Sequence, residues 1–324
     1  MARYTGPGAN EIFSIAETFR DRCLLREESL LDDTKAVWTL DSLKELHEVF
    51  VLAPDEGDQN FIEKLEGQIR DSGEDVIRLI AEVLCVYFLF PSNVGGARKR
   101  ELVNKVLGWA GQALKTDHAV SVAFPNGIGS GGQGYNTRRP NEIAFLIELA
   151  IAWKERFSAD DRALVVADQK LFQEFVDSIE DADSRQLRHM LLYLLFPDHF
   201  ERIASRNHKL RIVETFAGLV KADNSDTDSA IKAIRGRLEE LLPGEELDFY
   251  RPPLREAWFD DSDGVSEETP LDVIQHKKQI VLYGPPGTGK TYRAKRLAGL
   301  VIRSAALKKS GAARYFQSLA GISE

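Results

Sequence analysis

The stretch from residue 276 to residue 302 limits the possible folds more than any other part of the sequence. It contains Gly284-Pro-Pro-Gly-Thr-Gly-Lys-Thr291, which matches the phosphate-binding pattern G-x-x-x-x-G-K-[ST], the P-loop. The apolar run Gln279-Ile-Val-Leu-Tyr283 before it predicts a β-strand, and residues 292–303 after it predict a helix. A strand, a glycine-rich loop and a helix in this order predict the first unit of an α/β nucleotide-binding domain.

Each part of this motif has a chemical reason. The glycines let backbone N–H groups turn toward a phosphate, and the positive end of the following helix adds to the attraction. Lys290 is expected to reach the β- and γ-phosphates, and the Thr291 hydroxyl is expected to hold Mg²⁺. The residues predicted to bind nucleotide are Gly284, Pro285, Pro286, Gly287, Thr288, Gly289, Lys290, Thr291 and Tyr292, with Thr291 as the metal ligand. No catalytic residue is predicted.

The sequence after Thr291 is short and has no second apolar strand that ends in acidic residues. A P-loop NTPase needs such an acid for its metal, and a parallel sheet needs helices on both faces. We therefore expect a truncated nucleotide domain that, as given, neither hydrolyses nor tightly binds nucleotide.

Composition and charge indicate a cytoplasmic protein of two or more domains. The chain has 324 residues, 43% of them hydrophobic, and no apolar run of the roughly 18 residues that a membrane span needs. Its start is not a signal peptide, and Cys23 and Cys85 lie in apolar helical patterns that predict reduced core thiols. The net charge of −9 is uneven, because residues 245–275 are strongly acidic and residues 276–324 are basic.

The fold class predicted from these patterns is mostly α. Helical periodicity recurs from residue 9 to residue 243, and Ser72-Gly-Glu-Asp75 has the spelling of a capping box. We predict a multi-helix N-terminal domain over 1–244, an acidic linker over 245–270, and the start of the P-loop domain over 271–324. Helices are expected at 10–25, 38–50, 61–69, from Asp75 to Pro91, and at 101–114, 141–157, 171–179, 184–196, 198–220 and 229–242.

Two features of the N-terminal region leave alternatives open. The glycine-rich segment 125–140 is predicted to be neither helix nor central strand, and is either a surface linker or an ordered binding loop. Residues 61–103 resemble residues 172–213 at an offset of roughly 106 to 110 residues, which indicates either a repeated helical hairpin or coincidence.

Basic residues in this region are candidates for a phosphate-facing surface, and an ordinary solvated face is the alternative. No histidine or cysteine spacing predicts a metal site, and the paired acids lie in turns or in the linker. The possible nucleic-acid contacts are Arg98, Lys99, Arg100, Arg138, Arg139, Arg202, Arg206, Lys209 and Arg211.

The run from Gln279 to Tyr292, with a tyrosine on each side of the P-loop, resembles the AAA+ module of McrB-type proteins. The segment Tyr193–Lys209 and the loop 127–139 resemble the helical N-terminal region of some bacterial McrB-like ATPases. That resemblance implies a ring-forming NTPase that uses GTP or ATP with Mg²⁺ and drives a McrC-type nuclease in bacterial defence. It also implies target selection, often of modified DNA, by the N-terminal region.

Two other interpretations remain open at this point. MoxR-type remodelling ATPases share most of the P-loop run, so the chain could belong to that group instead. Residues 1–244 could also be a protein-interaction or sensor module that does not contact DNA. The metal-holding acids, the signature asparagine and the arginine finger of the McrB-type family have no counterpart here.

Overall fold

The computed structural model describes residues 3–54, 57–220, 226–252, 254–259 and 290–320, together with residues 274, 277, 279–281 and 283. The chain divides into two compact units, Met1–Arg206 and Asn207–Glu324. Each unit is helical, and no strand is formed in the described ranges, where β-pairing is limited to the isolated bridges Glu28–Ala36 and Pro91–Gly129. The prediction of a mostly α chain is confirmed.

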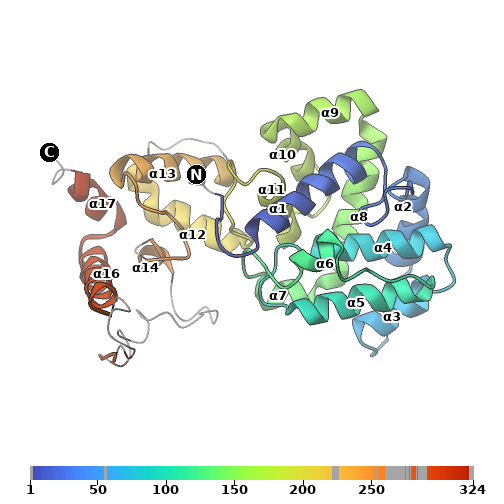
Figure 1. Ribbon diagram of the computed structural model, residues 1–324. Helices are drawn as coiled ribbons and strands as arrows, with labels where there is room; N and C mark the ends of the chain where they lie inside the picture. The colour runs from blue at the N-terminus through green and yellow to red at the C-terminus, as the bar shows by residue number, and fades with distance from the viewer. Residues whose placement is uncertain are drawn as a thin grey trace. The chain divides into compact units, whose positions relative to one another are not determined.

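The first unit is a bundle of short and medium helices, shown from blue to yellow-green in Figure 1. Its elements are α1 (Ala9–Thr18), the π-helix η1 (Phe19–Leu25), α2 (Leu40–Leu46), the π-helix η2 (His47–Val51), α3 (Phe61–Ile69), α4 (Glu74–Tyr87), α5 (Gly96–Trp109), α6 (Ala119–Ala123), α7 (Gly132–Thr137), α8 (Arg139–Arg156), α9 (Ala159–Ala167), α10 (Gln169–Asp177), the 3₁₀ helix η3 (Ala182–Ser184) and α11 (Gln186–Leu195).

Helix α4 is central to the core of this unit. It packs against α2, α5 and α8, and all its residues from Val76 to Tyr87 are buried. Cys85 on α4 and Cys23 on η1 are both buried and free, as predicted, and burial raises the pKa of each thiol. A helix that is buried around its whole circumference is stabilised by tertiary packing more than by its own propensity.

The capping box forms one helix earlier than the sequence predicts. The N-cap of α4 is Gly73, which has no side chain to accept a hydrogen bond, so the capping box expected at Ser72 is absent. Helix α3 has one instead, because Asn60 Oδ1 accepts from the backbone N–H groups of Ile62 and Glu63, and the backbone N–H of Asn60 donates to Glu63 Oε2 at 3.2 Å.

A buried carboxylate ties the segment after η1 to α4. Glu82 is fully buried and accepts hydrogen bonds from Ser29 Oγ, from the backbone N–H of Leu30 and Leu31, and from Trp38 Nε1. Burial raises the pKa of Glu82, and these donors act in the opposite direction. A carboxyl group removed from water is tolerated only when donors replace the lost hydration, and this network supplies them.

The second unit begins within α12 (Arg206–Phe216), which is followed by the 3₁₀ helix η4 (Ala217–Leu219). Its other described helices are α13 (Thr227–Leu241), α14 (Arg255–Trp258), α16 (Lys290–Ser310) and α17 (Ala312–Ala320). Its aromatic centre is Phe216, whose ring lies 5.8 Å from that of Phe249 and 6.0 Å from that of Phe316.

The boundary between the units falls earlier than the predicted residue 244, and part of the predicted acidic linker is packed. Phe249, Leu254 and Trp258 are buried, and Trp258 Nε1 donates to the carbonyl of Phe249 at 2.8 Å. The acidic residues of this segment are separated by apolar side chains, and burial of those side chains holds the segment in place. Residues 260–270 lie outside the described residues.

Each copy of the proposed repeat contains two helices, then a proline, then a third helix. These are α3, α4 and α5 in the first copy and α10, α11 and α12 in the second. Their matching tyrosines have different partners. Tyr87 pairs with Tyr135, whereas Tyr193 Oη accepts from the backbone N–H of Tyr4 at 2.7 Å. The repeat stays a prediction.

Candidate functional site

The P-loop is described only at its end. Lys290 and Thr291 are the first two residues of α16, which runs to Ser310 and is longer than the predicted helix 292–303. Lys290 is partly buried and Thr291 is exposed, whereas Tyr292 is described only as part of the helix backbone. The other predicted nucleotide-binding residues, Gly284 to Gly289, lie outside the described residues.

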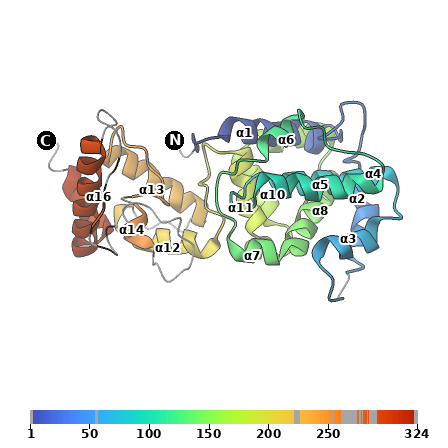
Figure 2. The ribbon, with the colours of Figure 1, turned by 60° about the horizontal axis from the view of Figure 1, so that its bottom comes forward.

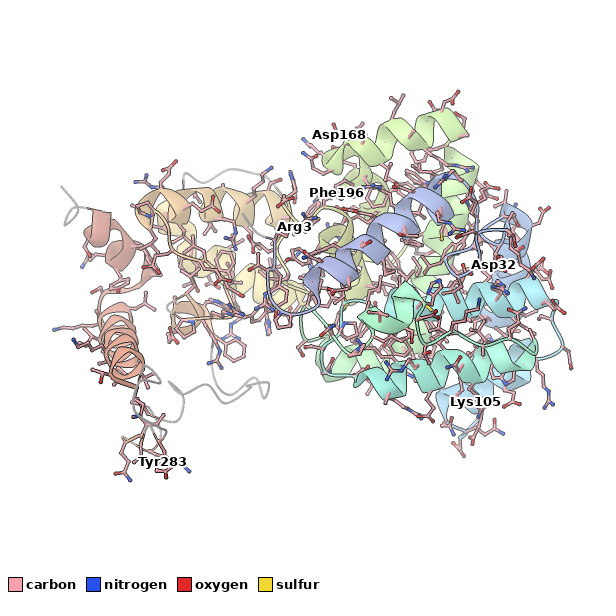
Figure 3. The ribbon with its side chains drawn as sticks, in the orientation of Figure 1. Arg3, Asp32, Lys105, Asp168, Phe196 and Tyr283 are labelled. Atoms are coloured by element: carbon pink, nitrogen blue, oxygen red, sulfur yellow. The ribbon has the colours of Figure 1, made fainter. Side chains whose placement is uncertain are left out.

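The strand expected before the P-loop is not formed at any of its described residues. Gln279, Ile280, Val281 and Tyr283 have no regular secondary structure, and Val281 and Tyr283 are 87% and 100% exposed. The side chain of Tyr283 is labelled in Figure 3. A strand needs neighbours to satisfy its backbone N–H and C=O groups, and the described part of the chain offers it none.

A mostly apolar cavity of about 700 Å³ lies beside the start of α16. Lys290 and Thr291 line it together with Ile274, Ile280 and the α16 side chains Ala294, Leu297, Ala298, Val301 and Ile302. Lys290 and Thr291 therefore lie beside an apolar face of α16, the helix that they begin. Such a face is suited to packing against further protein.

Two of the predicted nucleic-acid contacts are buried and cannot reach a phosphate in this structure. Lys99 is 0% exposed, and its Nζ donates to the carbonyls of Pro91 at 2.8 Å and Asn126 at 2.9 Å. Removal from water lowers the pKa of Lys99 to about 8. Lys209 is equally buried and forms an ion pair with Asp228. For these two lysines the predicted surface position is wrong, because the helical spacing does not reveal which face is buried.

Most of the predicted arginine contacts also have partners within the protein. Arg202 donates to Ile128 O at 2.9 Å and lies 5.1 Å from the ring of Tyr4, and Arg100 contacts Ser121 O at 3.4 Å. Two exposed arginines are paired, Arg98 with Glu101 at 2.6 Å and Arg206 with Asp183 at 3.8 Å. Arg138 is exposed and Arg211 is partly buried. Surface pairs of this kind are weak, so a phosphate could displace them.

The glycine-rich segment is an ordered part of the first unit. It contains α7, although no helix was expected there, and Tyr135 in α7 is fully buried. Tyr135 Oη donates to Tyr87 O at 2.9 Å, Tyr87 Oη donates to Tyr135 O at 3.0 Å, and the two rings stack at 4.3 Å. The interpretation as a surface linker is therefore wrong.

Two glycines of this segment are required by close contact. A Cβ at Gly127 would lie 2.4 Å from Ser92 Cα, and one at Gly129 would lie 2.7 Å from the ring of Phe90. The close approach allows Ser92 N to donate to Gly129 O at 2.8 Å. Lys99 stabilises the same junction, because its Nζ donates hydrogen bonds to Pro91 O and Asn126 O. Lys99 is therefore a structural clamp for the loop.

Arg139, another predicted contact, lies in an aromatic setting at the start of α8. Its guanidinium carbon is 5.0, 5.6 and 5.7 Å from the ring centres of Phe61, Tyr87 and Phe88. Arg139 also lines a cavity of about 660 Å³ in the first unit, whose other polar lining residues include Lys64, Asn136 and Glu148. Lys64, Asn136 and Glu148 were not predicted as site residues. Glu148 could have been found, because it is a charged residue within the apolar run 143–153.

Comparison with models of known protein families, with characterised proteins and with solved structures finds no match to this chain. Within the described residues, no group of three or more histidine, cysteine, aspartate or glutamate side chains could hold a metal ion. None of the described helices combines the length and the apolar character that crossing a membrane requires.

Proposed function

We propose that this chain is the N-terminal part of a McrB-like AAA+ NTPase, which couples hydrolysis of GTP or ATP to DNA restriction by a partner nuclease. The observation that carries the proposal is the position of Lys290. The motif lysine and threonine open helix α16, and this is the arrangement that a P-loop needs to aim backbone N–H groups and a lysine at phosphates. Mg²⁺ would be held through Thr291.

In this proposal the first unit selects the target, and the nucleotide domain assembles with other copies into a ring in the cytoplasm. A McrC-like nuclease would be the second partner. DNA contact would use the arginines that remain exposed, Arg98, Arg138 and Arg206. The apolar face of α16 beside Lys290 supports the view that further protein packs there in the assembled domain.

The test is Mg²⁺-dependent binding of fluorescent GTP and ATP analogues to the full-length protein that contains this chain. Lys290→Ala should abolish binding, because the lysine supplies the charge at the β- and γ-phosphates. Lys295→Ala is the matched control, since Lys295 is exposed on the same helix and lies outside the motif. Equal binding by the Lys290→Ala variant and its parent would refute the proposal.

A second candidate is the interaction or sensor module of a MoxR-like remodelling ATPase that does not contact DNA. The burial of Lys99 and Lys209 favours it, because it removes two cations from the expected surface. The salt dependence of DNA binding separates the candidates. Changing Arg98, Arg138 and Arg206 to glutamine should flatten the slope by about 0.9 for each lost phosphate contact if the restriction proposal holds. An unchanged slope, or no binding, favours the sensor.

A further inference from the structure

The 660 Å³ cavity of the first unit has the size of a small-molecule site. Its walls come from the end of η2, from α3, from the junction of α7 and α8, and from the turn before η3. Figure 2 shows α3, α7 and α8 after a 60° turn about the horizontal axis, which brings the bottom of Figure 1 forward. The lining combines basic, acidic and aromatic side chains, so it differs from an apolar packing defect.

One end of the cavity is cationic. Arg139 is held by the faces of three aromatic rings, and no carboxylate among the described residues lies within ion-pair distance of it. Its Nε is buried without a hydrogen-bond partner in the described part. Lys64 adds a second cation from α3. The Tyr87 side chain takes one hydrogen bond from Arg139, and the N–H donors that it does not use can bind an oxyanion.

The other end is acidic. Glu148 and Arg139 are nine residues apart on α8, which corresponds to roughly 13 Å along the helix axis. Glu180 and Asp181 line the cavity with Glu148, and Asp181 is paired with Arg185 at 2.7 Å. Burial is the main cause that raises the pKa of Glu148, and the charges of Glu180 and Asp181 raise it further. His47, whose Nε2 is 3.9 Å away, and Arg185, which also lines the cavity, lower it. The acidic end would be stabilised by an added cation.

We propose that this cavity binds a small zwitterionic molecule, with its carboxylate or phosphate at Arg139 and Lys64 and its ammonium group at Glu148. The separation of the two charged ends selects a ligand in which several bonds lie between the two groups. Phe50 and Phe61 also line the cavity and would cover an apolar body. The proposal does not depend on the nucleotide-binding motif, which lies in the other unit.

The experiment is a ligand-observed NMR titration of the full chain with ω-amino acids of increasing length. The series runs from glycine through 4-aminobutyrate and 6-aminohexanoate to 8-aminooctanoate, with hexanoate and hexylamine as ligands that lack one charge. The affinity should rise with length to an optimum, and the best ω-amino acid should bind at least about tenfold more tightly than hexanoate or hexylamine. A phosphate arm, phosphoethanolamine with inorganic phosphate as its control, shows which oxyanion is preferred.

Three variants assign the binding to the cavity. Glu148→Gln should remove the advantage of the ω-amino acid over hexanoate, and Lys64→Gln should weaken every anionic ligand. Glu155→Gln is the matched control, because Glu155 is on the same helix, lies outside the cavity lining and is paired with Lys44 at 2.7 Å. Circular dichroism checks that each variant is folded.

Three results would overturn the proposal. The first is no binding at any chain length, and the second is equal binding of hexanoate and 6-aminohexanoate. The third is an affinity that changes no more in Glu148→Gln and Lys64→Gln than in the control Glu155→Gln, because the ligand would then bind elsewhere. An affinity optimum at one length, lost selectively in Glu148→Gln, supports it.

Discussion

Replacing Glu82 with alanine tests whether the buried carboxylate organises the first unit. The change leaves Ser29 Oγ, the backbone N–H groups of Leu30 and Leu31, and Trp38 Nε1 without their acceptor. A buried donor without a partner costs about 1–3 kcal/mol, but such costs do not add fully because neighbouring groups rearrange. We expect a loss of roughly 3–5 kcal/mol in the free energy of unfolding, because four buried donors lose their acceptor and their separate costs add only in part.

The pH dependence of the stability of Glu82→Gln provides a second, independent test of the role of Glu82. Because burial raises the pKa of Glu82, its carboxyl group favours the folded state below the unfolded pKa of about 4.3. That contribution is lost as the pH rises through the raised pKa of the folded state. Glutamine does not titrate, so Glu82→Gln should gain stability relative to the wild type as the pH rises from about 4.3 through the raised pKa of the folded state.

The assay is urea unfolding followed by tryptophan fluorescence and by far-ultraviolet circular dichroism. Trp38 belongs to the network and reports on it directly. Glu101→Ala is the control, because Glu101 is exposed and paired only at the surface, and it should change stability by less than about 0.5 kcal/mol. A Glu82→Ala variant within about 1 kcal/mol of the wild type would show that the hydrogen bonds of Glu82 do not hold the segment after η1.

Two further predictions concern the junction between the glycine-rich segment and α4. The pKa of Lys99 is lowered to about 8, so the wild type should gain stability relative to Lys99→Met as the pH rises from about 8 to about 10, by up to roughly 1.4 kcal/mol per pH unit. Unfolding curves at several pH values measure this difference, and parallel curves would contradict it. Gly127→Ala places a methyl group 2.4 Å from the backbone of Ser92 and should cost about 2 kcal/mol or more, whereas Gly108→Ala, in the open on α5, should be neutral or stabilising. Thermal melts compare the two variants, and equal melting temperatures would refute the clash.

The sequence by itself determined the helical class, the burial of Cys23 and Cys85, and the position of the helix that follows the P-loop. These depend on local patterns, namely a period of 3.6 residues, apolar runs and a glycine-rich motif, and local patterns are readable without a fold. The division of the chain into two units was harder to predict from the sequence. The segment 245–259 is acidic, and only its packing through Phe249 and Trp258 shows that it belongs to a folded unit.

The tertiary structure decided what the polar residues do. Lys99 and Lys209 look like surface cations in sequence, yet backbone carbonyls hold one and Asp228 holds the other inside the protein. Glu82 and Tyr135 reveal their roles only when segments about 50 residues apart meet, as at Glu82 and Leu30 or at Tyr87 and Tyr135. The cavity of Arg139 and Glu148 likewise needs four separate segments. The physical reason is that periodicity fixes which residues share a face, whereas burial and pairing depend on which face another segment covers.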